Sequence, residues 1–334
     1  MIVQVNDTSQ VAEARRVAAE LARRASFDEA DAGRVALVAT ELATNLLKHG
    51  GGGALNLDLF DDADGSGVEL LALDKGRGMA DVQRCFEDGY STAGSPGTGL
   101  GAVARMADRH AVFSRPAQGT VLMARCRRKA SPVAPREVRR RAEIAAVSVP
   151  YPGETVCGDG WAHHATDGSE TLLVVDGSGH GAAAATASAT AIQYFRAHPG
   201  DDLPSLGQGL HRALAPTRGA AIAVIRLDTR RQQAAIVGVG NISAALFADG
   251  KVQRLVSHNG TAGHIAPRVR EFSYPYAGRP LLVAHTDGIG TRWDLNAYPG
   301  LLSMHPAIIA GLLFRDFRRA RDDATAVVLR GLAA

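Results

Sequence analysis

The feature that most constrains this chain is a basic, proline-containing segment near its middle, because the hydrophobic patterns on its two sides differ. The segment runs from residue 125 to residue 141, carries Pro132 and Pro135, and has neither helical nor strand periodicity. A basic run of this kind is more often a solvated connector than a binding patch. At 334 residues the chain is also too long for one ordinary core. We therefore predict domains at residues 1–127 and 143–334, with a linker at residues 128–142.

Composition argues against several classes of protein. The net charge is only +3, and the basic residues are not interleaved with aromatic ones, so we expect no nucleic-acid partner. No window approaches the roughly 20 apolar residues that cross a bilayer, and the first ten residues lack a signal-peptide pattern. We expect no membrane association and a cytoplasmic location. The three cysteines are widely spaced without a CxxC pair, which favours reduced, structural thiols.

The first half predicts helices followed by strands. Apolar residues recur at helical spacing over residues 11–21, and a second helix runs to about Lys48, with Ser26 and Glu29 as a candidate capping box. Strands are expected at residues 55–59, 68–73, 111–114 and 120–125, with a short helix after Gly99. This order suggests an antiparallel or mixed sheet covered on one face.

The second half is richer in strands. We expect them at residues 144–149, 171–175, 220–227, 233–239, 244–247, 281–285 and 325–329, and helices at residues 182–197, 203–214 and 306–315. Two sheets with helices outside them are the economical packing, so the whole chain is expected to be an α+β protein.

A candidate nucleotide site lies in the first half. Glu41 and Asn45 are four residues apart and therefore share one face of the second helix, which supplies one base and one metal ligand. Asp74 ends a buried strand and is followed by Gly76 and Gly78, where the backbone turns sharply or approaches a ligand closely. A glycine-rich turn then opens a helix, which is a favourable place for phosphate. That turn is Gly97, Thr98, Gly99, Leu100 and Gly101.

This series resembles the N, G1 and G2 boxes of the GHKL ATPase and kinase superfamily, and within it the RsbT and RsbW class of serine kinases and anti-sigma factors. The resemblance covers about residues 11–127 and implies a GHKL α/β sandwich that binds ATP and Mg²⁺. It implies that Asn45 ligates Mg²⁺, that Asp74 binds the adenine amino group, and that the glycine-rich turn contacts phosphates. Glu41 would be the general base for a substrate serine, and residues 86–96 would form the ATP lid.

Aspartates recur at the ends of predicted strands in the second half. Asp159 lies between two glycines, Asp176 and Asp287 each precede a glycine directly after a strand, and Asp322 precedes the last strand. Each Asp-Gly alone is a common turn. Strands that deliver several carboxylates to one edge, however, gather negative charge that only a hard cation makes tolerable.

The whole series resembles the SpoIIE-type branch of the PPM metal-dependent protein phosphatases, with an RsbX-like opening at residues 153–159. The resemblance covers about residues 143–331 and implies an α-β-β-α sandwich with two Mn²⁺ or Mg²⁺ ions. The implied ligands are Asp159, Asp176, Asp287 and Asp322, together with the Gly177 carbonyl. Asp323 is expected to contact the ligands rather than to bridge the metal ions. His180 would either approach the phosphate or pack within its loop, and His285 would pack in the sheet.

Together the resemblances imply a protein-serine phosphatase, and on the same chain an ATP-dependent serine kinase, in a bacterial partner-switching stress response. The implied partner is a STAS-domain phosphoprotein, which could be a sigma-factor regulator. An alternative makes the first domain a non-catalytic, ATP-dependent binding module that regulates the phosphatase. A third reading is a scaffold with two inactive sites.

Overall fold

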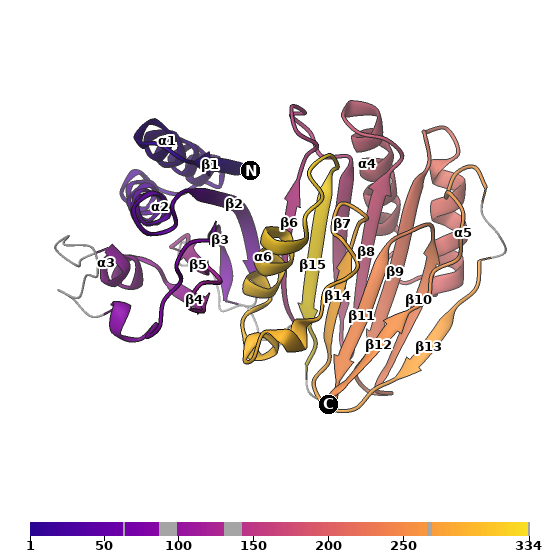
Figure 1. The fold of residues 1–334 in the computed structure, drawn as a ribbon. Coiled ribbons are helices and arrows are strands. Elements are labelled where there is room, and N and C mark those ends of the chain that lie inside the picture. Colours follow the sequence, from indigo (N-terminus) through magenta and orange to yellow (C-terminus); the bar gives the residue numbers. More distant parts are fainter. Residues whose placement is uncertain (63, 87–98, 130–141, 266–268, 333–334) are drawn as a thin grey trace. The chain divides into compact units, whose positions relative to one another are not determined.

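The computed structural model describes residues 1–62, 64–86, 99–129, 142–265 and 269–332. The fold is mixed α/β, as expected, and divides into two compact units (Figure 1). The first unit consists of Met1–Arg139 and Leu295–Arg315, and the second of Arg140–Asp294 and Asp316–Ala334. The domain boundaries at residues 127 and 143 stay a prediction. Within the described ranges, no helix combines the length and the apolar character needed to cross a bilayer.

The N-terminal part of the first unit is a five-stranded antiparallel sheet with three α-helices. Its elements are β1 (Ile2–Val5), α1 (Thr8–Arg24), α2 (Glu29–His49), β2 (Gly53–Asp62), β3 (Gly65–Asp74), a 3-10 turn (Arg84–Phe86), α3 (Gly99–Met106), β4 (Arg109–Ser114) and β5 (Thr120–Arg127). The strand order is β1-β2-β3-β5-β4. The edge strand β1 was not predicted, because four residues are too few to show an alternation.

Aspartates begin both long helices. The Asp7 side chain accepts hydrogen bonds from the backbone N–H groups of Ser9 and Gln10, and the Gln10 side chain returns to the Asp7 N–H, which completes a capping box. Asp28 caps α2 by accepting from the N–H of Asp31 at 2.7 Å. The capping box predicted at Ser26 is therefore wrong.

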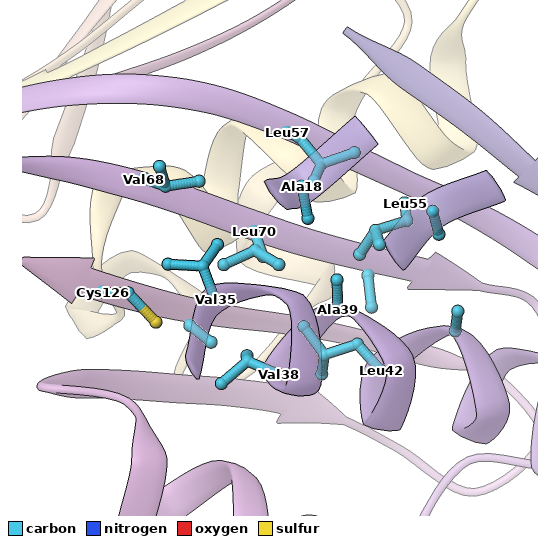
Figure 2. Packing of buried hydrophobic residues seen from close by; sticks show 14 of the residues in the cluster. Ala18, Val35, Val38, Ala39, Leu42, Leu55, Leu57, Val68, Leu70 and Cys126 are labelled. Carbon is cyan, nitrogen blue, oxygen red and sulfur yellow. The ribbon is translucent and has the colours of Figure 1, made fainter. Parts of the chain in front are cut away.

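One face of the sheet forms a continuous core with the helices. The side chains that α2 directs at the sheet include Val35, Val38 and Leu42, all fully buried, and they meet Leu57 and Leu70 from β2 and β3 (Figure 2). These positions follow the helical period of about 3.6 and the strand period of 2. This packing fixes the rotation of α2 and so places its polar residues.

The second face of the sheet is also covered within this unit. α6 (Pro306–Phe317) belongs to it up to Arg315. A side-chain carbon added at Gly311 would lie 2.8 Å from Leu71, 3.0 Å from Leu73 and 3.1 Å from Val121, so glycine lets the helix approach the sheet closely. The sequence predicted cover on one face only.

The second unit contains two five-stranded sheets. Its elements are β6 (Glu143–Val149), β7 (Asp159–Thr166), β8 (Ser169–Gly177), α4 (Ala182–Ala197), α5 (Leu203–Leu214), β9 (Ala220–Asp228), β10 (Gln233–Val239), β11 (Ser243–Ala248), β12 (Lys251–Leu255), β13 (Phe272–Pro275), β14 (Leu281–His285) and β15 (Ala324–Arg330). Two further 3-10 turns, Leu295–Ala297 and Leu301–Ser303, precede α6 in the chain. The sheet orders are β13-β10-β9-β8-β7 and β12-β11-β14-β15-β6.

The two sheets of this unit share a core. Leu172 and Val174 of β8 pack in one buried cluster with Leu282 and Ala284 of β14. The alternate β8 residues, such as Leu173, join the helices α4 and α5 in a separate cluster on the other face. Residues at the ends of β8 and β14 can therefore meet at one end of the sandwich.

Candidate functional site

The candidate nucleotide site is built on the polar face of α2. A side-chain carbon added at Gly99, the first residue of α3, would lie 3.2 Å from Asn45 Oδ1 and 3.4 Å from Glu41 Oε2. The glycine therefore lets the start of α3 approach both polar side chains. Asn45 Nδ2 is buried and has no hydrogen-bond partner among the described residues. A buried amide donor without a partner is costly, and it fits a site that is completed by a ligand.

Asp74 lies against the end of the same helix. Its Oδ1 accepts a hydrogen bond from the Gly76 N–H at 2.8 Å, and burial raises the pKa of its carboxyl group. A side-chain carbon at Gly76 would lie 2.8 Å from the backbone of His49 and Gly50, where α2 ends. The end of α2 and the loop after β3 are thus in contact, which brings Asp74 close to the helix that carries Glu41 and Asn45.

The other residues predicted for the nucleotide site are glycines and their neighbours, and only some of them lie in the described part of the chain. Gly78 has φ 65°, and an added side chain would overlap the Arg115 carbonyl. Leu100 packs against the hydrophobic core, and Gly101 is buried. Gly97, Thr98 and most of the predicted lid lie outside the described residues.

The candidate metal site lies at one end of the two-sheet unit. Asp159 begins β7 and pairs directly across the ladder with Asp176, near the end of β8. Asp287 follows β14 by two residues, and Asp322 precedes β15 by two residues. β14 and β15 are antiparallel neighbours, so both carboxylates come to the same end of their sheet.

A buried hydrogen bond connects the two sheets at this end. The Thr286 hydroxyl group donates to Asp159 Oδ2 at 2.7 Å, and it accepts from the Thr325 N–H at 3.0 Å. Asn241, in the turn after β10, donates through Nδ2 to Asp287 Oδ2 at 2.7 Å. Sequence reasoning assigned no role to Asn241 or to Thr286. The available signal was a polar residue directly after a strand for Thr286, and two residues after a strand for Asn241.

The clustered carboxyl groups repel one another. Burial, followed by the charges of Asp287 and Asp322, raises the pKa of Asp176 to about 7. Burial and then the Asp176 charge raise the pKa of Asp159 well above its usual value. Burial and the neighbouring Asp287 also raise the pKa of Asp322. The structure therefore brings together the four carboxylates that the sequence singled out.

The donor set fits hard cations. Asp159 Oδ1 and Asp323 Oδ2 are buried atoms without a hydrogen-bond partner in the described chain, and their residues are 7% and 3% exposed. Carboxylate oxygens are the preferred ligands of Mg²⁺ and Mn²⁺. Among the described residues, no group of three or more His, Cys, Asp or Glu side chains is arranged so that it could hold a metal ion as it stands. The carboxylates converge without closing, as expected for like charges.

Glycine and a backbone bond shape the same corner. The Gly177 N–H donates to the Gly158 carbonyl at 3.2 Å, and a side chain at Gly177 would overlap the Ala184 carbonyl. Asp323 Oδ1 accepts from the Tyr151 N–H at 2.8 Å and so holds the loop before β7. His285, fully buried, donates through Nδ1 to the Thr286 carbonyl and accepts from the Trp293 indole N–H, which agrees with the predicted sheet packing.

Comparison with known proteins identifies both halves. The model of the histidine kinase-like ATPase domain matches residues 5–125, and that of stage II sporulation protein E (SpoIIE) matches residues 166–331. The serine/threonine-protein kinase RsbT of Bacillus subtilis (strain 168) is 30% identical over 122 residues, which are 36% of this chain and 92% of RsbT. The chain belongs to the RsbT family. In this RsbT-family chain the kinase-like ATPase domain is followed by a SpoIIE domain.

Several solved structures have a similar fold. A chain from the bacterial stressosome, described as a modular system adapted to control secondary messenger signalling, is 27% identical with a TM-score of 0.53, covering 57% of this chain and 100% of its own. RsbX in complex with magnesium is 20% identical with a TM-score of 0.51, covering 58% and 97%. The PP2C phosphatase domain of Bacillus subtilis SpoIIE, with a fragment of its regulatory domain, is 17% identical with a TM-score of 0.50, covering 97% and 94%. The RsbT-family chain thus carries a PP2C-type phosphatase fold.

Proposed function

We propose that the second unit is a metal-dependent protein-serine phosphatase that acts on a STAS-domain phosphoprotein in a bacterial partner-switching circuit. The observation that carries the proposal is the convergence of Asp159, Asp176, Asp287 and Asp322, together with a buried Asp159 oxygen atom that has no hydrogen-bond partner among the described residues. The relation to RsbT and the likeness to a stressosome chain support the choice of circuit and partner.

In this proposal the four carboxylates and the Gly177 carbonyl would hold two Mn²⁺ or Mg²⁺ ions. Such ions would lower the pKa of a bound water and polarise the phosphate group, so that no protein nucleophile is needed. Thr286 keeps one Asp159 oxygen in place, and Asn241 does the same for Asp287. Asp323 supports the site by fixing the Tyr151 backbone.

Metal-dependent turnover tests this proposal. Purified full-length protein should release phosphate from a phosphoserine STAS protein with Mn²⁺ present, and EDTA should abolish the release. Asp287→Asn should abolish it too, whereas Asp249→Asn should leave it unchanged, because Asp249 lies in an exposed turn whose φ of 49° suits asparagine. Equal activity with and without metal would refute the proposal.

We further propose that the first unit binds ATP and Mg²⁺ and phosphorylates a serine of the same class of partner. Asn45 would ligate Mg²⁺, Asp74 would bind the adenine amino group, and the glycines from residue 97 to 101 would contact phosphates. Glu41 would accept the proton of the substrate hydroxyl group, while bound ATP supplies the phosphoryl group. The closeness of Gly99 to both Glu41 and Asn45 supports these roles.

The alternative is a module that binds ATP and the partner without phosphoryl transfer. Transfer of labelled γ-phosphate to a STAS protein should be lost in Glu41→Gln while ATP binding persists. Glu13→Gln is the matched control, because Glu13 is exposed on α1. No transfer by the unchanged protein, with normal ATP binding, would favour the alternative.

A further inference from the structure

A pocket of about 540 Å³ opens at the acidic end of the second unit. Its lining residues include Asp176, Asp287 and Asp322, together with Tyr151, His180 and Arg321. All of its lining residues belong to this unit. The pocket is therefore the space in which a substrate phosphate would meet the proposed metal ions.

The proposed metal site alone would not balance the negative charge of the substrate phosphate. The four ligand carboxylates together carry the charge that two divalent cations neutralise. A phosphoserine brings a further charge of about −1.5 to −2 at pH 7. A basic side chain at the pocket is thus needed to complement the substrate.

His180 does not meet this need. Its Nδ1 lies 2.9 Å from Glu154 Oε1, and its ring stacks on Tyr151 with centroids 4.3 Å apart. A positive charge on His180 would be balanced by the Glu154 carboxylate, so the pair adds no net positive charge. Of the two uses that the sequence left open for His180, these contacts favour packing within the loop.

Arg321 is differently placed. It is exposed at the pocket, and within the described ranges it forms no ion pair with any carboxylate. It also directly precedes the candidate ligand Asp322 in the chain. Among the residues that line the pocket, it is the one basic side chain whose charge no described residue balances.

Resting on the proposed phosphatase function, we propose that Arg321 binds the phosphoryl group of the substrate and positions it against the metal ions. A guanidinium group can donate two parallel hydrogen bonds to two phosphate oxygens. The competing role is charge balance: Arg321 could stabilise the acidic cluster itself, in which case its removal would change metal affinity instead of phosphate affinity.

Measuring the phosphate affinity and the Mn²⁺ affinity of the same variants distinguishes phosphate binding by Arg321 from stabilisation of the acidic cluster. In full-length protein loaded with Mn²⁺, calorimetry should show that Arg321→Ala weakens binding of inorganic phosphate by about 10-fold or more, because a hydrogen bond to a charged group contributes about 1.5–3 kcal/mol. The KM for a phosphoserine peptide should rise in parallel, with Mn²⁺ affinity unchanged. Arg321→Lys should recover part of the lost affinity, since lysine keeps the positive charge but cannot donate two parallel hydrogen bonds.

The matched control is Arg231→Ala, whose side chain is 80% exposed in the same unit and does not line the pocket. It should leave both affinities unchanged. Equal phosphate affinity in the unchanged protein and in Arg321→Ala would overturn the Arg321 proposal, and so would no phosphate binding at all or a loss that follows Mn²⁺ affinity. If the phosphatase is active but phosphate affinity is equal in the unchanged protein and in Arg321→Ala, only the Arg321 proposal is refuted. If there is no metal-dependent turnover, the proposed function is refuted.

Discussion

Thr286 is fully buried, and its hydroxyl group connects the two sheets of the second unit at the acidic end. Replacing it with valine keeps the shape but removes the donor to Asp159 and the acceptor for the Thr325 N–H. We expect Thr286→Val to weaken Mn²⁺ binding by roughly 10- to 100-fold, because residues that orient metal ligands typically contribute this much. Isothermal titration with Mn²⁺ measures the effect.

Thr166→Val provides the comparison, because Thr166 is exposed at the far end of β7. Its Mn²⁺ affinity should match that of the unchanged protein. If both variants bound Mn²⁺ normally, Thr286 would be a packing residue without influence on Asp159.

The raised pKa of Asp176, about 7, predicts how pH affects the metal-free protein. A carboxyl group whose pKa is higher in the folded state than in the unfolded state stabilises the fold at low pH, and this stabilisation is lost as pH rises through the folded-state pKa. The free energy of unfolding of the second unit should therefore fall between about pH 4 and pH 7. Bound Mn²⁺ needs ionised carboxylates, so the increase in Tm that it causes should grow over the same range.

Thermal unfolding in EDTA and in Mn²⁺, from about pH 4 to pH 8, measures both effects. Asp176→Asn should flatten the pH dependence in EDTA and reduce the increase in Tm with Mn²⁺. A metal-free protein equally stable across this range would show that the carboxyl groups do not interact as described.

The sequence predicted the acidic residues of the candidate metal site but missed residues that contact the site from distant parts of the chain. Asp176, Asp287 and Asp322 could be found because each lies at the end of a predictable strand, and Asp159 because it lies between two glycines in the same series of motifs. Asn241 and Glu154 could not, because their importance comes from contacts with Asp287 and His180, which are distant in the chain. Such contacts depend on the register and packing of separate strands, which a local pattern does not encode.

Among the elements, β3 and β5 carry a buried ion pair. Glu69 and Arg125 are direct cross-strand partners, 5% and 3% exposed, with Arg125 Nη2 2.6 Å from Glu69 Oε2. We expect Arg125→Leu to lower the free energy of unfolding by roughly 3–5 kcal/mol, because it leaves the Glu69 carboxylate buried without its partner. The double variant Glu69→Leu/Arg125→Leu should recover most of this loss.

Hydrogen exchange of the β3 and β5 amides is the suitable measurement, because both tryptophans, Trp161 and Trp293, lie in the second unit. Arg23→Leu removes an exposed pair with Glu20 and should change stability by less than about 1 kcal/mol. Equal losses in Arg125→Leu and in the double variant would argue against the buried-charge explanation.

Most elements followed from local periodicity, and the exceptions have physical reasons. β7 has polar residues such as His163 and His164 where an alternation would place apolar ones, and its register comes from pairing with β8. β13 has four residues, and β12 is an edge strand with exposed positions. The start of α2 was misassigned because Ser26 satisfies the capping-box pattern, whereas its positive φ of 62° and the Asp28 cap show where the helix begins.

For the whole molecule, the grouping of residues 295–315 with the first unit makes a testable difference. A fragment of residues 1–127 would lack the segment that covers Leu71, Leu73 and Val121. We expect this fragment to expose an apolar sheet face and therefore to bind the dye ANS and self-associate. Gel filtration and ANS fluorescence against the full-length protein measure this.

A synthetic peptide of residues 295–317 should reduce the ANS signal of the fragment. The same peptide with Gly311→Val should be less effective, because an added side chain at this position meets three leucine and valine side chains. A monomeric fragment that does not bind ANS would mean that the segment contributes nothing to the fold of the first unit.

The chain passes from one unit to the other three times, near residues 140, 295 and 315. A single protease cut in the linker would therefore not release a self-sufficient kinase-like half, since part of that half remains attached to the other product. Recombination at the linker would likewise separate residues 1–127 from the segment that covers one face of their sheet.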